Sequence, residues 1–320
     1  MALSEFQLIH RYFESSRFAA APGAGVIVGV GDDAAVLRMP PESDLAVSID
    51  TLVRGVHFPA DMAPADIAWR SLAVNLSDMA AMGAQPLWFT LALTMDHADE
   101  SWLEHFSRTL AEIAERFGVA LVGGDTTRGP LTISIEIHGA VPRSGALLRS
   151  GASPGDGLYV TGWPGLAALG LRRLGSGEVA SDDPAVAAFL RPEPRVDFGI
   201  GLRGLASAAI DVSDGLLADA GHIAERSAVA LEIDVARLPL AAALQGLETR
   251  EDAWTLCLSG GDDYELCFTA PTESAEAIAR LAQRHALTCT RIGTVSAGEG
   301  VHCHGFEPPR AGFDHFGGLA

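Results

Sequence analysis

Carboxylates recur along this sequence in short segments that also contain glycine or a small hydroxyl residue. In chain order, the segments are residues 31–33, 48–51, 75–78, 123–127, 211–215 and 260–263. Each one alone fits a turn or a helix N-cap. Together they favour chemistry, because carboxylates gathered in one place repel one another unless cations lie between them. Hard oxygen ligands select magnesium, calcium or manganese over zinc.

Asp78 is the most informative of these carboxylates. It falls within a predicted helix at residues 65–82 whose core face would be formed by Ile67, Leu72, Leu76 and Met79. Asn75 and Asp78 are three positions apart and share a flanking face. A solvated patch would explain that face, but the neighbouring residues are small and apolar, which predicts burial. A buried carboxylate needs a partner, and a metal ion is the natural candidate.

Composition narrows the possible chemistry. The net charge is −19, and all 22 basic residues are arginine. An acidic surface disfavours nonspecific binding to nucleic acid or to anionic lipid. The absence of lysine excludes a Schiff base and a P-loop lysine. Phosphates would therefore be bound by arginine, by metal or by backbone N–H groups at residues 123–124 and 260–261, with Arg128 and Arg149 as candidate clamps.

These segments are spaced along an alternation of strands and helices, which predicts a mixed α/β fold in two halves joined near residues 143–157. In the first half the predicted strands are 26–30, 34–38, 45–53, 87–95, 119–122 and 131–141, with helices at 65–82 and 101–117. In the second half the predicted strands are 158–161, 208–212, 230–235, 264–269 and 288–295, with helices at 165–174, 195–206, 216–227 and 273–285. Ser101 and Glu104 form a capping-box pattern, and the last twenty-odd residues are expected to be coil. Four of the acidic segments directly follow an apolar run, which places their carboxylates at strand ends.

The ordered set of segments resembles the thiamine-monophosphate kinases, a family within the aminoimidazole-ribonucleotide-synthetase-like ATP-binding superfamily. The resemblance is carried by residues 5–6, 31–33, 50–53, 57–58, 73–84, 123–130, 149–152, 211–215, 260–266 and 314–316. It implies a kinase that phosphorylates thiamine monophosphate to thiamine diphosphate. The γ-phosphoryl of ATP would pass in line to the substrate phosphate, with several magnesium ions and no phosphoenzyme.

The resemblance also implies an architecture. Residues 1–142 would form an ATP- and metal-binding domain whose sheet makes a β-barrel at a homodimer interface, and residues 143–320 would form a C-terminal α/β domain. A secretion signal and a continuous apolar run of spanning length are both missing from the sequence, so we expect a cytoplasmic protein without a membrane segment.

Site residues follow from the resemblance, motif by motif. The magnesium ligands would be Asp33, Ser48, Ile49 (through its carbonyl), Asp50, Asp78, Asp125, Asp211 and Asp214, of which Asp50, Asp78 and Asp125 are the catalytic set. ATP would contact Gly124, Asp125, Arg149 and Ser213, and thiamine monophosphate would contact His57, Asp262 and Phe313. Three positions depart from the common pattern: Ile49 replaces threonine or serine, Asp262 replaces glutamate, and Phe313 replaces tyrosine.

Other functions stay open at this point. Aminoimidazole-ribonucleotide synthetase is the nearest alternative. Selenophosphate synthetase is disfavoured because the first of the four cysteines is Cys257, far from the N-terminus. A maturation scaffold of this superfamily commonly ends in a cysteine-bearing tail, which this chain lacks. A calcium-binding structural protein would keep the carboxylates but would not bind nucleotide.

Overall fold

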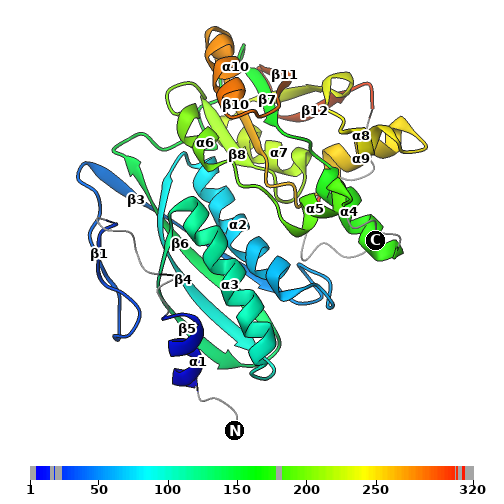
Figure 1. Cartoon of the computed structure of the whole chain (residues 1–320). Helices are drawn as coiled ribbons and strands as arrows, with labels where there is room; N and C mark the ends of the chain where they lie inside the picture. The colour runs from blue at the N-terminus through cyan, green and yellow to red at the C-terminus, as the bar shows by residue number, and fades with distance from the viewer. Residues whose placement is uncertain are drawn as a thin grey trace. The chain divides into compact units, whose positions relative to one another are not determined.

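The computed structural model describes residues 5–14, 18, 24–177, 182–306, 308 and 312–313. The chain divides into two compact units, one of Met1–Met79 with Ala84–Ser144 and one of Ala80–Gly83 with Gly145–Ala320 (Figure 1). Each unit combines a sheet with helices, which confirms the predicted mixed α/β, two-domain fold. The metal-binding and dimerising roles expected of residues 1–142 stay predictions.

The first unit is built on a four-stranded sheet in the order β3-β6-β4-β5. Its strands are β3 (Ser43–Val53), β6 (Thr132–Pro142), β4 (Gln85–Met95) and β5 (Ala120–Arg128). The β4–β5 pair is parallel and the other two pairs are antiparallel. Ile133, Ile135 and Ile137 alternate along β6 and are at most 1% exposed, as their spacing predicts. The sheet is open, with β3 and β5 as its edge strands.

Helices α2 (Pro64–Ala81) and α3 (Glu100–Phe117) lie along one face of this sheet (Figure 1). The expected capping box at Ser101 is wrong. Asp99 is the N-cap, and its side chain accepts the N–H groups of Ser101 and Trp102. A carboxylate two residues earlier reaches those free N–H groups and also favours the positive end of the helix dipole. Smaller elements complete the unit: α1 (Glu5–Tyr12) and the two-stranded sheet of β1 (Val26–Val28) and β2 (Val36–Leu37).

The second unit is built on a six-stranded sheet in the order β12-β9-β11-β7-β10-β8. Its strands are β7 (Gly157–Thr161), β8 (Ala208–Asp211), β9 (Ala230–Asp234), β10 (Leu266–Ala270), β11 (Cys289–Ser296) and β12 (Gly300–His304). Its helices are α4 (Leu166–Ser176), α5 (Pro184–Leu190), α6 (Val196–Leu202), α7 (Leu216–Ser227), α8 (Ala242–Gln245), α9 (Arg250–Ser259) and α10 (Ala275–Arg284). Val160, Ile210 and Leu231 are among the buried side chains of its core.

Several elements of the second unit were not predicted. Strand β12 lies in a segment expected to be coil, and it pairs in parallel with β9, about seventy residues earlier in the chain. No residue pattern within the segment predicts that it pairs with β9. Helices α5, α8 and α9 were also missed. The first two are short, and α9 is capped by Thr249, whose hydroxyl accepts the N–H of Asp252.

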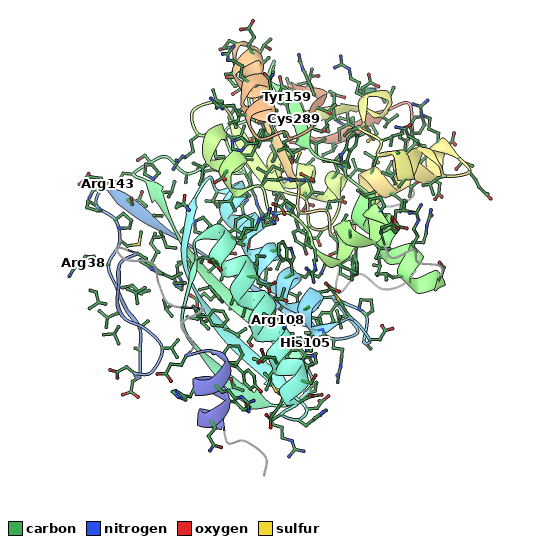
Figure 2. All side chains as sticks on the ribbon, viewed as in Figure 1. Arg38, His105, Arg108, Arg143, Tyr159 and Cys289 are labelled. Carbon is green, nitrogen blue, oxygen red and sulfur yellow. The ribbon has the colours of Figure 1, made fainter. Side chains whose placement is uncertain are left out.

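Three of the four cysteines have thiols whose pKa is raised by burial. Cys257 and Cys267 are fully buried, as predicted, and burial raises the pKa of both thiols. Cys289 lies near Tyr159 on the paired strands β11 and β7 (Figure 2), and burial raises the pKa of its thiol to about 12. Such thiols are poor nucleophiles, because the thiolate is the reactive form. Within the described ranges, none of the helices combines the length and apolar character needed to cross a bilayer.

Candidate active site

Ser48 and Asp78 meet in the first unit. The Ser48 hydroxyl on β3 donates to the Asp78 carboxylate on α2 over 2.5 Å. Both side chains are only partly buried, so they are open to a further partner. Asp50 lies two positions beyond Ser48 and therefore projects from the same face of β3. Three oxygen-bearing side chains of the predicted metal set thus share one side of the sheet, the side that α2 covers.

Asp50 lies inside β3, as the predicted strand at 45–53 implied, whereas Asp125 lies inside β5 and not at the end of a strand at 119–122 as the sequence suggested. Strand β3 continues to Val53 because β6 pairs with it along its whole length. Strand β5 continues past the two glycines because β4 pairs with it as far as Arg128. Glycine is required at position 124, since a Cβ there would lie 2.0 Å from the Leu91 carbonyl oxygen.

Within one four-stranded sheet, the structure does not bring Asp125 to the Ser48–Asp78 pair. Strands β3 and β5 are the two edges, with β6 and β4 between them. Three strand spacings separate the edges by roughly 14 Å. The side chain of Asp125 is exposed on β5, and Asp33 is exposed in the bend between β1 and β2.

The second unit gathers another set of predicted residues around the loop that follows β8. Asp211 ends this strand and is only 6% exposed. Asp262 donates its backbone N–H to the Ser213 carbonyl over 2.8 Å, and Phe313 donates its own to the Asp214 carbonyl over 2.9 Å. Residues predicted to bind metal, ATP and thiamine monophosphate therefore converge on this one loop.

Asp219 holds this loop in place. Its Oδ2 atom accepts the backbone N–H groups of Ser213, Asp214 and Gly215 over 3.0–3.1 Å. The side chain is 3% exposed, and burial, followed by the nearby Asp214 charge, raises its pKa to about 7. Sequence reasoning missed this residue. Its position four residues after Gly215, one turn into α7, was the available signal.

Arg149 and His57 have backbone contacts that position them. The Ser227 hydroxyl accepts the N–H groups of Gly151 and Ala152 and donates to the Arg149 carbonyl, each over 3.1 Å. The Arg149 side chain itself is exposed. In the first unit, the His57 Nδ1 atom accepts the Val53 N–H over 3.0 Å, which leaves Nε2 as the protonated nitrogen of the neutral ring. No local pattern pointed to Ser227.

The donor chemistry fits magnesium. In the described part of the chain, no three His, Cys, Asp or Glu side chains are arranged to hold a metal ion. That is compatible with magnesium, which usually keeps several waters and binds through one or two carboxylates and substrate phosphates. Asp78 supplies a carboxylate oxygen beside the Ser48 hydroxyl. Asp50 lies on the same face.

The matches to known domain families cover most of the chain. The AIR synthase related protein, N-terminal domain, matches residues 31–141, and the C-terminal domain of the same proteins matches residues 153–304. These two matches, in the two units of the fold, define the chain as an AIR synthase related protein.

Full-length relatives narrow this class. The thiamine-monophosphate kinase of Escherichia coli (strain K12) is 47% identical over 99% of both chains. The crystal structure of thiamine-monophosphate kinase from Stenotrophomonas maltophilia K279a has a TM-score of 0.87 at 46% identity, covering 95% of this chain and 98% of that one. AaThiL complexed with AMPPCP and TMP has a TM-score of 0.77 at 30% identity, covering 97% and 96%. The chain belongs to the thiamine-monophosphate kinase family, as its motifs predicted.

Proposed function

We propose that this protein transfers the γ-phosphoryl group of ATP to the phosphate of thiamine monophosphate, forming thiamine diphosphate and ADP. The observation that carries this proposal is the match to thiamine-monophosphate kinases over nearly the whole length of the chain. The solved relative in complex with AMPPCP and TMP supports both substrates. The chain is therefore an ATP-dependent kinase whose acceptor is a phosphate.

The reaction makes modest demands on side chains. The acceptor is already an anionic phosphate, so no strong general base is needed. Positioning and charge neutralisation carry the catalysis. When bound, Mg²⁺ supplies neutralisation of the phosphate oxygens. We assign its ligands to the predicted set of carboxylates, with Ser48 and Asp78 as the pair that the fold brings into contact.

The remaining roles follow from the same chemistry. Arg149 neutralises ATP phosphate from a segment that Ser227 holds, and the Gly124 backbone lies open on β5 for close approach of the nucleotide. In the second unit, Asp219 fixes the Ser213–Asp214 backbone, so that this backbone is already ordered before the substrates bind. His57, Asp262 and Phe313 remain the proposed contacts to thiamine monophosphate.

The proposal is tested by incubating the purified protein with ATP, Mg²⁺ and thiamine monophosphate and measuring thiamine diphosphate by chromatography. We expect product only with the monophosphate, and complete loss of product with EDTA, because the acidic site repels ATP unless metal is present. Thiamine as the acceptor is the control. Phosphorylation of thiamine itself, or turnover that survives EDTA, would contradict the proposal.

We also propose that the first unit forms a homodimer through its sheet. Leu45, Val47 and Ile49 alternate along edge strand β3 and are 51%, 51% and 63% exposed, on the face opposite to Ser48 and Asp50. A long edge strand with an apolar face is a template for pairing with another chain. Closing two such sheets into a barrel would bring the β3 edge of one copy to the β5 edge of the other.

Replacing Val47 by glutamate is expected to convert the dimer to a monomer, because the charge would be buried at the proposed interface. Sedimentation velocity measures the change, and kinase activity should fall with it. Leu171→Glu is the matched control, since Leu171 is 40% exposed on α4 of the other unit. If the Val47→Glu protein sediments with the same mass as the wild-type dimer, β3 is not the interface.

A further inference from the structure

The turn at residues 262–264, between α9 and β10, has an unfavourable backbone conformation. Asp262 and Tyr264 have φ angles of 70° and 51°, in the left-handed region that residues with a Cβ rarely adopt. In the described part of the chain, the other non-glycine residues with positive φ occur singly, at Glu42, Ser144, Ala228 and Ala286. Such a conformation persists only where the surrounding structure holds it, and it is common at functional sites.

The backbone of this turn is hydrogen-bonded to the loop that follows β8. Asp262 donates its N–H to the Ser213 carbonyl, and Tyr264 donates its own to the Val212 carbonyl, each over 2.8 Å. These bonds extend the antiparallel pairing of β10 with β8. The conformation of the turn therefore sets where Asp262 lies relative to this loop.

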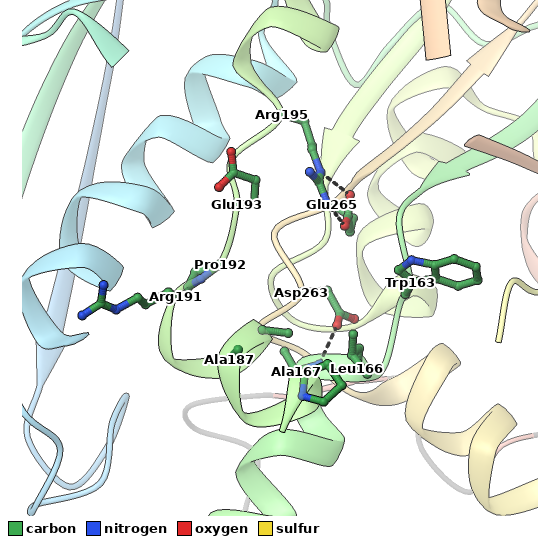
Figure 3. A pocket seen from close by; sticks show the side chains of 12 residues that line it. Trp163, Leu166, Ala167, Ala187, Arg191, Pro192, Glu193, Arg195, Asp263 and Glu265 are labelled. Atoms are coloured by element: carbon green, nitrogen blue, oxygen red, sulfur yellow. Dashed lines mark hydrogen bonds and ion pairs between the residues drawn. The ribbon is translucent and has the colours of Figure 1, made fainter. Parts of the chain in front are cut away.

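The side chain of Asp263 holds the turn from the other side. It points to the start of α4 (Figure 3), where Oδ2 accepts the Gly165 N–H over 2.7 Å and Oδ1 accepts the Ala167 N–H over 3.3 Å. Asp263 is only 9% exposed, so water cannot easily replace these bonds. The N-terminus of α4 is thus capped by a residue 98 positions further along the chain.

Helix α4 depends on this remote cap, because its own N-cap position supplies none. Gly165 occupies that position with a φ of 84°, and it forms no side-chain cap. A Cβ there would lie 2.6 Å from the Cys257 backbone nitrogen, so serine or aspartate would not fit. Removing the Asp263 side chain would leave buried N–H groups without an acceptor, which links the start of α4 to the turn energetically.

Asp263 and Glu265 line a pocket of about 270 Å³ (Figure 3). Packing cannot hold the turn on the side that faces this space, so hydrogen bonds must hold it. Glu265 accepts from Arg195 over 2.8 and 2.5 Å and from the Thr161 hydroxyl over 2.6 Å. Those contacts fix the segment that leads into β10, and the Asp263 contacts fix the turn itself.

We propose that Asp263 is a positioning residue of the kinase: by capping α4 it holds the left-handed turn and so sets where Asp262 lies. The inference rests on the proposed function, in which Asp262 contacts thiamine monophosphate. Asp263 acts through its neighbour and does not itself contact a substrate. A displacement of about 1 Å at a contact residue can lower a rate about a hundredfold, so the cap has a large effect on the reaction.

A double-mutant cycle tests this role. Asp263→Asn keeps the shape of the side chain but turns one of its two acceptors into a donor, so one N–H group loses its partner. Asp262→Ala removes the proposed substrate contact, and the double variant completes the cycle. Asp99→Ala is the matched control, because Asp99 also accepts two N–H groups at the start of a helix, α3. The kinetic constants for both substrates are measured, and hydrogen exchange followed by mass spectrometry reports on each segment.

We expect Asp263→Asn to lower kcat/KM for thiamine monophosphate by about tenfold to a hundredfold. The KM for ATP should stay at its wild-type value, because Asp219 holds the Ser213 backbone independently. In the Asp262→Ala background, Asp263→Asn should lower kcat/KM by less than about twofold, since it acts through the residue already removed. Asp99→Ala should keep wild-type kcat and KM.

Hydrogen exchange gives a readout that does not depend on turnover. In Asp263→Asn, the amides of residues 165–167 and 262–264 should exchange faster, while those of the first unit keep their wild-type rates. Faster exchange throughout the second unit would show a general loss of stability and would overturn the positioning role. Unchanged exchange at residues 262–264 would overturn it as well.

The outcomes separate this role from the proposed function. If wild type forms no thiamine diphosphate, the kinase proposal fails, and the exchange pattern alone decides whether Asp263 holds the turn. If wild type is active and the two substitutions lower kcat/KM by independent factors, Asp263 does not act through Asp262 and the positioning role is wrong.

Discussion

Replacing Asp78 by asparagine is expected to lower kcat/KM by about a thousandfold, or roughly 4 kcal/mol of transition-state stabilisation. The change removes one negative charge from the proposed magnesium site and keeps the shape of the side chain. The amide oxygen still accepts from the Ser48 hydroxyl, so the contact between α2 and β3 should persist. Steady-state kinetics at saturating Mg²⁺ measure the effect, and thermal unfolding reports on the fold.

Asp61→Asn is the control for this variant. Asp61 is exposed in the turn before α2 and belongs to neither set of site residues, so its replacement should leave kcat and KM unchanged. A folded Asp78→Asn protein with wild-type turnover would show that Asp78 does not serve the metal. Equal losses in the two variants would point to a general effect of charge near α2.

Replacing Arg195 by methionine should lower the free energy of unfolding of the second unit by about 3–5 kcal/mol, because Glu265 would be left as a buried charge without its cation. The pair is bidentate and Glu265 is 6% exposed, so water cannot replace the guanidinium easily. Calorimetry of thermal unfolding is the appropriate measurement, since a two-domain chain can unfold in more than one step.

A double-mutant cycle shows whether the loss comes from the orphaned charge. Arg195→Met combined with Glu265→Gln should recover much of the stability, because the double variant buries no net charge. Arg172→Met provides the comparison at an exposed pair. Arg172 binds Asp252 over 3.0 Å with both side chains nearly half exposed, and its removal should cost less than about 1 kcal/mol. Similar costs for the two arginines would contradict the assigned role of burial.

Local sequence patterns were sufficient to predict features that depend on a single helix or strand. The alternation of Ile133, Ile135 and Ile137 identified the buried face of β6 because side chains in a strand point to opposite faces in turn. Gly118 ended helix α3 as expected, in the left-handed conformation that glycine adopts without strain. Asp78 lies on a largely buried helix and has the Ser48 hydroxyl as a partner, although its own side chain is only partly buried; the metal ion expected beside it stays a prediction.

The ends of strands and the N-caps of helices were harder to predict from the sequence, because they depend on which partner groups are available for the backbone hydrogen bonds. Strand β5 runs through Gly123 and Gly124 since β4 offers hydrogen bonds along its whole length, and local glycine content alone suggested a turn. Asp99 caps α3 in place of Ser101 because its carboxylate accepts the N–H groups of Ser101 and Trp102, so the helix begins two residues earlier than the capping-box pattern predicted.

The sequence by itself determined the chemistry of this protein: its carboxylates, its lack of lysine and the ordered motifs that identify the kinase family. Tertiary structure alone decided which of these residues meet. Ser48 and Asp78 are thirty residues apart, Asp214 and Phe313 are about a hundred apart, and Arg195 and Glu265 are seventy apart. Such contacts depend on how the strands pair and how the helices pack, and neither is encoded within the short segments that carry the motifs.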